Sequence, residues 1–308
     1  MSDYNLIIIL GATASGKTRL AVHLAHDISG EIISADSRQI FRQMDIGTGK
    51  DLREYNIGDQ HVPYHLIDIL PPGHRYNVDA FKNDFYDAID SIILRKKMSV
   101  LCGGTGMYIH SLLQNQDYTA VRVNERLRSA LGALSKEELI NKLQAYEKQT
   151  TQHADLSSKK RLIRAIEIAA YLKTDKLEIK KRPTLKPIVF GLKTEVEITR
   201  SKILSRLHHR LRNGMIEEVA QLLKDGVDKD TLIFYGLEYK FIVNYLDGLL
   251  SFDELENKLG IAICQYAKRQ NTFFRKMEKD GVAINWLNGM EEVNLLKQRI
   301  TDKVSGKI

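Results

Sequence analysis

Cysteine, proline and tryptophan are scarce in this sequence, and it contains no long hydrophobic run. Its 308 residues include two cysteines, five prolines and one tryptophan. Cys102 and Cys264 lie in apolar stretches far from any metal-ligand pattern, so we expect two buried thiols rather than a metal site. The apolar runs are too short to cross a bilayer, and the first residues lack a signal-peptide pattern. We therefore expect a cytoplasmic protein with no membrane partner.

The most informative segment that is present is a glycine-rich loop. The sequence GATASGKT follows an apolar run, Leu6–Leu10, and precedes a stretch with helical periodicity, Lys17–Ile28. This spacing predicts a phosphate-binding loop, in which backbone N–H groups and a helix N-terminus surround an anion. Lys17 would add a positive charge, and the Thr18 hydroxyl suits a Mg²⁺ ion that bridges two phosphates. The predicted diphosphate- or nucleotide-binding residues are Gly11, Ala12, Thr13, Ala14, Ser15, Gly16, Lys17 and Thr18.

Short apolar segments alternate with helical periods over the first 110 or so residues. This alternation predicts an α/β fold: a parallel sheet like that of P-loop NTPases, flanked by helices and binding ligands at the carboxyl ends of its strands. The expected strands are Leu6–Leu10, Glu31–Ser34, Tyr64–Ile69 and Ser99–Cys102, joined later by Pro187–Leu192 and Val282–Leu287. The expected helices of this part are Lys17–Ile28, Asn77–Arg95 and Met107–Gln114.

The character of the sequence changes in the middle of the chain. Residues 116–182 are polar, charged and helical in pattern, with two long helices expected at Asn124–Thr150 and Ser157–Lys173. We interpret them as a helical insertion domain between a first core part, 1–115, and a second, 183–308. The second part holds a helical block, Glu197–Lys279, with breaks expected at Asn213–Gly214 and Asp225–Gly226.

Positive charge is in excess, and it is clustered. The formal net charge is +7, and basic residues concentrate in 159–182, 200–212 and 268–279. A single basic run is usually a solvated helix face. Three such runs beside a phosphate-binding loop favour a polyanionic partner.

Three further segments carry polar groups that suit a binding site. Ser34-Ala35-Asp36-Ser37-Arg38-Gln39 follows the second expected strand, and Gly103-Gly104-Thr105-Gly106 follows the fourth. Asp36 thus lies where an open α/β sheet presents ligands, although a helix N-cap or an indirect magnesium ligand is the alternative. The third segment, Gln265–Gln270, falls on a late helix.

Taken together, these segments resemble the tRNA dimethylallyltransferase family, also called tRNA isopentenyltransferases. The resemblance spans about residues 5–290. The matching segments are GATASGKT at 11–18, SADSRQIFRQMDIGTGK at 34–50, YHLIDI at 64–69, GGTGMY at 103–108, RLIRAIE at 161–167, GMIEEV at 214–219 and QYAKRQNTFFR at 265–275.

The resemblance implies transfer of a dimethylallyl group from dimethylallyl diphosphate to N6 of adenosine 37 in the tRNA anticodon stem-loop, with Mg²⁺ as cofactor. It implies catalytic roles for Asp36, Lys17, Thr18 and Arg206. The tRNA contacts that it implies are Asp36, Ser37, Arg38, Gln39, Thr105, Arg128, Lys160, Arg161, Leu162, Ile163 and Arg164. Arg161 and Arg164 would share one helix face and grip adjacent phosphates. A monomer is the expected state.

Several positions depart from the family pattern. Ala12 replaces a proline in the loop, and Ser157-Ser158 replace an Asn-Asp pair. Glu238 and Phe241 interrupt a Gly-Tyr-Lys-Glu tetrad, and Phe273 stands for a tryptophan. Most of these changes fall where RNA contacts are expected, so they bear on tRNA docking more than on the transfer chemistry.

Three other functions fit parts of the sequence. An adenylate isopentenyltransferase of the cytokinin type would prenylate free AMP, ADP or ATP, but it needs no basic helical insertion. A small-molecule kinase would use the same loop for ATP, but no arginine-rich lid segment is evident. A non-catalytic RNA-binding module would not need to keep Lys17, Thr18 and Asp36.

Overall fold

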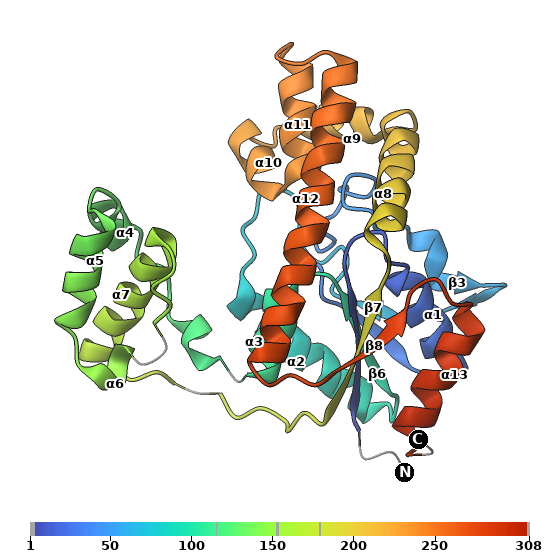
Figure 1. Ribbon diagram of the computed structural model, residues 1–308, viewed down its shortest axis with the longest axis horizontal. Coiled ribbons are helices and arrows are strands. Elements are labelled where there is room, and N and C mark those ends of the chain that lie inside the picture. Colours follow the sequence, from blue (N-terminus) through green and yellow to red (C-terminus); the bar gives the residue numbers. More distant parts are fainter. Residues whose placement is uncertain (1–3, 115, 152–153, 179, 307–308) are drawn as a thin grey trace. The chain divides into compact units, whose positions relative to one another are not determined.

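Six parallel strands form one sheet in the computed structural model, in the order β5-β2-β6-β1-β7-β8 (Figure 1). The structure describes residues 4–114, 116–151, 154–178 and 180–306. The strands are β1 Leu6–Gly11, β2 Glu31–Ser34, β5 Tyr64–His65, β6 Ser99–Gly103, β7 Pro187–Lys193 and β8 Ile284–Asn288. The predicted fold class, a parallel sheet flanked by helices, is confirmed.

β1 lies inside the sheet, between β6 and β7, and both of its faces are covered. Leu6 pairs in register with Ser99 of β6 on one side and with Pro187 of β7 on the other. Every residue from Leu6 to Leu10 is at most 2% exposed. Burial on both faces explains why β1 reads as a continuous apolar run instead of an alternating one.

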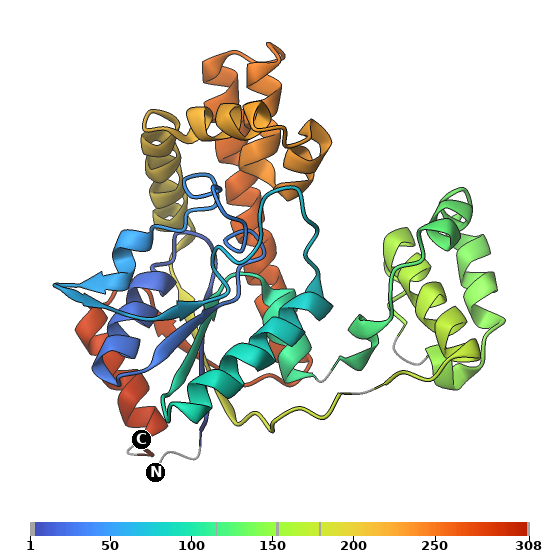
Figure 2. The same cartoon turned by 180° about the vertical axis from the view of Figure 1, so that it is seen from behind.

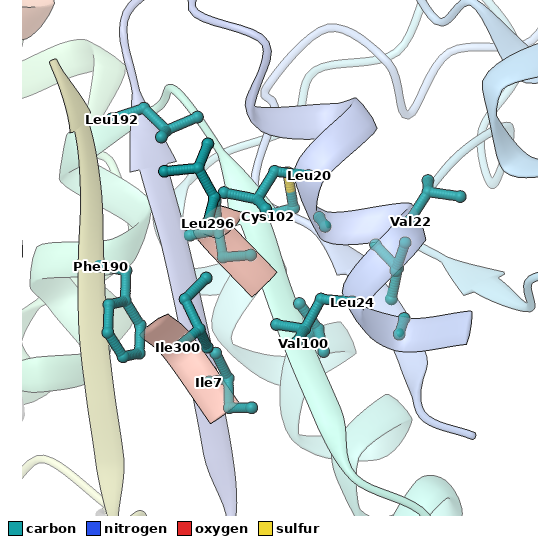
Figure 3. Close-up of a cluster of buried hydrophobic side chains, with 14 of the residues drawn as sticks. Ile7, Leu20, Val22, Leu24, Val100, Cys102, Phe190, Leu192, Leu296 and Ile300 are labelled. Carbon is teal, nitrogen blue, oxygen red and sulfur yellow. The ribbon is translucent and has the colours of Figure 1, made fainter. Parts of the chain in front are cut away.

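Different helices cover the two faces of the sheet. Ile7 and Ile9 of β1 pack with α1 (Lys17–Asp27) and α13 (Val293–Val304), as Figure 3 shows for Ile7. Leu6, Ile8 and Leu10 point to the other face and pack with α2 (Val78–Leu94), α3 (Gly106–Leu113) and the end of α12 (Phe252–Lys279). With both faces covered, the loops at the carboxyl ends of the strands are left to form a site.

Five helices from the second core part pack around a separate apolar cluster. They are α8 Val196–Leu211, α9 Met215–Lys224, α10 Lys229–Tyr235, α11 Leu237–Leu246 and α12. The long helix α12 contacts both α11 and α3, and so joins this cluster to the sheet (Figure 2). The breaks expected at Gly214 and Gly226 are confirmed, and both glycines have positive φ. Two further breaks were not expected: Gly236, and the Ser251 capping box that starts α12.

Residues Gln114–Arg182 form a second compact unit, distinct from Met1–Leu113 with Pro183–Ile308. The residue at the first expected boundary, 115, lies outside the described residues. The helices of this unit are α4 Glu125–Gly132, α5 Lys136–Gln144, α6 Lys148–Thr151 and α7 Lys159–Thr174. The single helix expected over Asn124–Thr150 was therefore wrong. Ser135 caps a new helix there, because its side chain and that of Glu138 form a capping box.

Two other parts of the structure differ from expectation. The strand expected at Tyr64–Ile69 ends after His65, because Leu66 and Asp68 adopt positive φ values of 61° and 57°. A short hairpin, β3 Asn56–Ile57 with β4 Gln60–His61, and helix α13 were not foreseen. Among the described residues, every helix falls short of the length or apolar character that a bilayer crossing requires.

Candidate active site

The loop between β1 and α1 forms a tight cradle. Gly16 adopts φ 84°, and α1 begins directly after it at Lys17. A Cβ on Gly11 would lie 2.6 Å from Ser15 Oγ, so a larger residue there would displace the Ser15 side chain. The Ser15 hydroxyl is buried and has no hydrogen-bond partner among the described residues. A buried, unsatisfied hydroxyl next to a helix N-terminus suits a bound anion.

Two cationic side chains belong to this cradle. The Lys17 ammonium makes no ion pair with any residue in the described ranges. Burial lowers the pKa of Lys17, and the Asp36 carboxylate partly offsets this effect. Arg206 of α8 donates from Nη2 to Thr13 Oγ1 at 2.5 Å. Burial, reinforced by Arg210, lowers the pKa of Arg206 to about 10. Neither cation has a carboxylate within ion-pair distance in the described part of the chain, and a buried cation without such a partner favours the binding of an anion.

Asp36 follows β2 and is partly buried. Its Oδ1 accepts the backbone N–H of Arg38 at 2.9 Å, which fixes the carboxylate in a local turn. Its charge acts on Lys17, whose pKa it raises against the effect of burial. Asp36 therefore stands as a carboxylate within electrostatic range of the cradle.

The loop after β6 connects the cradle to the Asp36 segment. Thr105 Oγ1 accepts the backbone N–H of Ser37 at 3.1 Å, and Thr105 N–H donates to the Ala35 carbonyl at 3.2 Å. Gln270 of α12 bridges to the phosphate-binding loop: its Oε1 accepts the Thr13 N–H, and its Nε2 donates to the Gly104 carbonyl, both at 2.9 Å. The ends of β1, β2 and β6 are thus hydrogen-bonded into one site.

Gln270 is expected to be a positioning residue for the cradle. Gln270→Met keeps the size of the side chain but leaves the Thr13 N–H and the Gly104 carbonyl without partners, which costs about 1–3 kcal/mol of stability. We expect the affinity for inorganic diphosphate, measured by calorimetry, to fall about tenfold, which corresponds to ~1.4 kcal/mol. Asn257→Leu, at an exposed position near the start of the same helix, is the control. Equal diphosphate affinity in the two variants would contradict the role.

Two of the expected RNA-contact residues beside Asp36 have partners within the protein. Arg38 Nη2 donates to the Phe234 carbonyl at 3.1 Å. The Gln39 amide accepts from Ser34 Oγ and donates to the Gly49 carbonyl, both at 3.2 Å. The Gln39 amide therefore stabilises the loop that follows β2, and the Arg38 guanidinium is fixed in place.

In the second unit, the structure separates the expected RNA-contact residues into two groups. Arg128 makes two 2.9 Å bonds to the buried Glu167 carboxylate, and Arg164 donates to the Tyr118 and Val121 carbonyls at 3.1 and 2.7 Å. Leu162 is fully buried in the core of the unit, and Ile163 packs against that core. Lys160 and Arg161 are exposed, with Arg161 paired to Asp155 at 2.9 Å.

These contacts bear on two expectations. The Leu162 side chain packs inside the unit. The Arg164 guanidinium binds carbonyls of its own unit, whereas the Arg161 side chain is exposed, so the paired phosphate contacts of Arg161 and Arg164 stay a prediction. Helical spacing placed both arginines on one side of α7, but only the packed unit shows which of them faces inward.

Two acidic residues beside the site were given no role by the sequence. The Glu218 carboxylate accepts backbone N–H groups of Asp45, Ile46 and Gly47 at 2.7–3.1 Å and the Tyr239 hydroxyl at 2.9 Å. It thereby ties α9 and α11 to the loop after β2. Glu238 lines a small cavity with Arg206 and Arg210, and burial raises its pKa. In the sequence, Glu218 could be noticed only as part of the matching segment GMIEEV. Glu238 could be noticed only as a departure from the Gly-Tyr-Lys-Glu tetrad.

Comparison with known proteins gives a consistent family. A family model described as IPP transferase matches residues 39–277, and one described as isopentenyl transferase matches residues 4–60. The chain is 47% identical over 288 residues to a tRNA dimethylallyltransferase 2 of Phocaeicola vulgatus, covering 94% of each chain.

Solved structures agree with the sequence comparisons. The chain is similar to the tRNA delta(2)-isopentenylpyrophosphate transferase of Staphylococcus epidermidis, with a TM-score of 0.70, 31% identity and coverage of 98% and 99% of the two chains. It is also similar to the full-length tRNA isopentenylpyrophosphate transferase of Bacillus halodurans, with a TM-score of 0.72, 29% identity and coverage of 99% and 97%.

Proposed function

The chain belongs to the IPP transferase family of tRNA dimethylallyltransferases, and we propose that it transfers the dimethylallyl group of dimethylallyl diphosphate to N6 of adenosine 37 in tRNA. The products are N6-dimethylallyladenosine and diphosphate. The observation that carries the proposal is a cradle with two buried cations, Lys17 and Arg206, neither of which has a carboxylate within ion-pair distance among the described residues. The same cradle contains the unsatisfied Ser15 hydroxyl. Asp36 lies in the same electrostatic environment. We propose a monomer, because one chain supplies all of these groups.

The cradle would bind the diphosphate of the prenyl donor. As the bond between C1 and oxygen breaks, its electron pair moves to the leaving diphosphate and negative charge builds there. Lys17, Arg206 and the loop N–H groups are already in place to stabilise that charge. Their desolvation makes this interaction stronger than it would be in water.

Mg²⁺ fits the site only as a partner of the bound diphosphate. Among the described residues, no group of three or more His, Cys, Asp or Glu side chains could hold a metal ion. Thr18 is the second residue of α1, and the lone pairs of its hydroxyl oxygen suit a cation whose other ligands are phosphate and water oxygens. When bound, the ion would supply positive charge to the leaving group.

Asp36 would accept the proton that the reaction releases. The adenine N6 lone pair is delocalised into the ring, so the amine becomes acidic only as its bond to C1 forms. In the proposed step, N6 bonds to C1, the bond from C1 to oxygen breaks, and a proton passes from N6 to the Asp36 carboxylate. A stacked anticodon-loop adenosine cannot reach a partly buried carboxylate, so the nucleotide must be extruded from the loop.

Prenylation of free adenylates is not supported. The relative named above, aligned over 94% of its length, is a tRNA enzyme, whereas the shorter isopentenyl transferase model matches residues 4–60 alone. The test combines purified protein, dimethylallyl diphosphate, Mg²⁺ and unmodified tRNA with adenosines at positions 36 and 37. Mass spectrometry of the digested tRNA should show N6-dimethylallyladenosine. Prenylated AMP without modified tRNA would overturn the proposal.

Lys160 and Arg161 are expected to contact tRNA phosphates. The double variant Lys160→Gln with Arg161→Gln should weaken tRNA binding. The slope of log affinity against log salt concentration should become less steep by about 0.7 for each phosphate that is no longer neutralised. Lys96→Gln with Lys97→Gln removes the same charge at exposed positions before β6, at the opposite end of the sheet from the site, and is the control. Binding isotherms at several salt concentrations measure the slopes. An unchanged slope in the Lys160→Gln, Arg161→Gln variant would show that these residues of α7 do not contact tRNA phosphates.

A further inference from the structure

Phe234 is an exposed aromatic residue near the end of α10. Its side chain is 55% exposed, although a buried position is usual for phenylalanine. The guanidinium carbons of Arg38 and Arg75 lie 5.5 and 5.6 Å from its ring centroid. Both distances are within the range of a cation–π interaction. Arg38 is an expected tRNA contact, but the reaction described above gives no role to the Phe234 ring or to Arg75.

Hydrogen bonds join the three chain segments that carry the cluster of Phe234, Arg38 and Arg75. Arg38 Nη2 donates to the Phe234 carbonyl at 3.1 Å. The neighbouring Tyr235 hydroxyl accepts the Gly73 N–H at 2.7 Å and donates to the His74 carbonyl at 2.8 Å. Tyr235 itself is buried against Phe41. The cluster is therefore built before any ligand arrives, which lowers the entropy lost on binding.

The cluster is connected directly to Asp36. The backbone N–H of Arg38 donates to Asp36 Oδ1, so the residue that contacts the Phe234 ring also fixes the proposed proton acceptor. Any RNA segment whose adenosine reaches Asp36 has its neighbouring nucleotides close to this surface. Extrusion of that adenosine removes stacking from its neighbours, which then need new partners.

We propose that Phe234, Arg38 and Arg75 form a stacking platform for an unpaired nucleotide next to the target adenosine. Single-stranded bases stack on aromatic rings and on arginine guanidinium planes, and the positive charges attract the adjoining phosphates. An apolar protein partner fits less well, because its docking would desolvate two guanidinium groups. The inference rests on the proposed tRNA prenyl transfer and adds a binding subsite to it.

The test is a double-mutant cycle between protein and RNA. Anticodon stem-loops are prepared intact, or with a single abasic nucleotide on the 5′ or the 3′ side of the target adenosine. On intact RNA, Phe234→Ala should lower kcat/KM about 5- to 150-fold, the range for loss of one stacked base. Phe234→Trp should keep most of the activity. One of the two abasic RNAs should lower wild-type kcat/KM by a similar factor, and Phe234→Ala should add little to that loss.

The controls separate the possible failures. Leu249→Ala removes another exposed apolar side chain, 69% exposed, and should act like wild type on every RNA. The KM for dimethylallyl diphosphate should be unchanged in Phe234→Ala. If Phe234→Ala loses the same factor on intact and both abasic RNAs, or loses nothing, the platform is wrong. If wild-type protein fails to modify intact RNA, the proposed function fails instead.

Discussion

Replacing Asp36 with Asn is expected to lower kcat about 10²–10⁴-fold while tRNA affinity changes little, because the variant loses a proton acceptor. The Asn side-chain oxygen can still accept the Arg38 N–H that Asp36 Oδ1 accepts at 2.9 Å. The turn, and the position of Arg38, should therefore persist. Single-turnover prenylation rates and tRNA binding isotherms measure the two effects separately.

Asp36→Ala completes this comparison. It removes both the proton acceptor and the acceptor of the Arg38 N–H, so it should lose as much kcat as Asp36→Asn and weaken tRNA binding as well. The difference between the two variants reports the positioning role alone. A normal kcat in Asp36→Asn, with weaker tRNA binding as its only defect, would show that Asp36 positions the RNA and accepts no proton.

Lys17→Met is expected to lower kcat/KM for dimethylallyl diphosphate about 10²–10³-fold or more. The variant removes a desolvated cation from the site of developing negative charge, where one preorganised group supplies about 3–4 kcal/mol. Arg206 remains, so residual activity above background is expected. Initial rates against donor concentration at saturating tRNA provide the measurement, and a normal kcat/KM would place the diphosphate elsewhere.

The same substitution should stabilise the protein without ligand. Burial lowers the pKa of Lys17 in the folded protein below its ordinary value of 10.5. The unfolded chain therefore binds the proton more tightly, and charged Lys17 destabilises the fold at any pH below the lowered pKa. Lys17→Met should raise the free energy of unfolding by about 0.5–2 kcal/mol at pH 7. The gain should shrink as the pH rises through the lowered pKa toward 10.5, and denaturant unfolding at several pH values checks this.

The core of the fold could be predicted because each of its first elements is specified by a pattern of residues that are close together in the sequence. The apolar run Leu6–Leu10, the glycines of GATASGKT and the helical period after Lys17 each specify their own conformation, and β1, the loop and α1 follow the prediction closely. Tyr64–Ile69 was also expected to be a strand, yet most of it is not one. Its backbone instead reverses at Leu66 and Asp68, and the Asp68 side chain pairs with the buried Lys50.

The sequence by itself determined the anion cradle, the parallel sheet and the family, because each depends on residues adjacent or regularly spaced in the chain. The tertiary structure decided through which contacts distant side chains complete the site. Gln270 reaches Thr13 across 257 residues and Arg206 reaches it across 193, while Arg128 and Arg164 turn inward to partners in their own unit. Such pairings arise only when distant segments pack together, since spacing along the chain fixes local direction and not long-range contact.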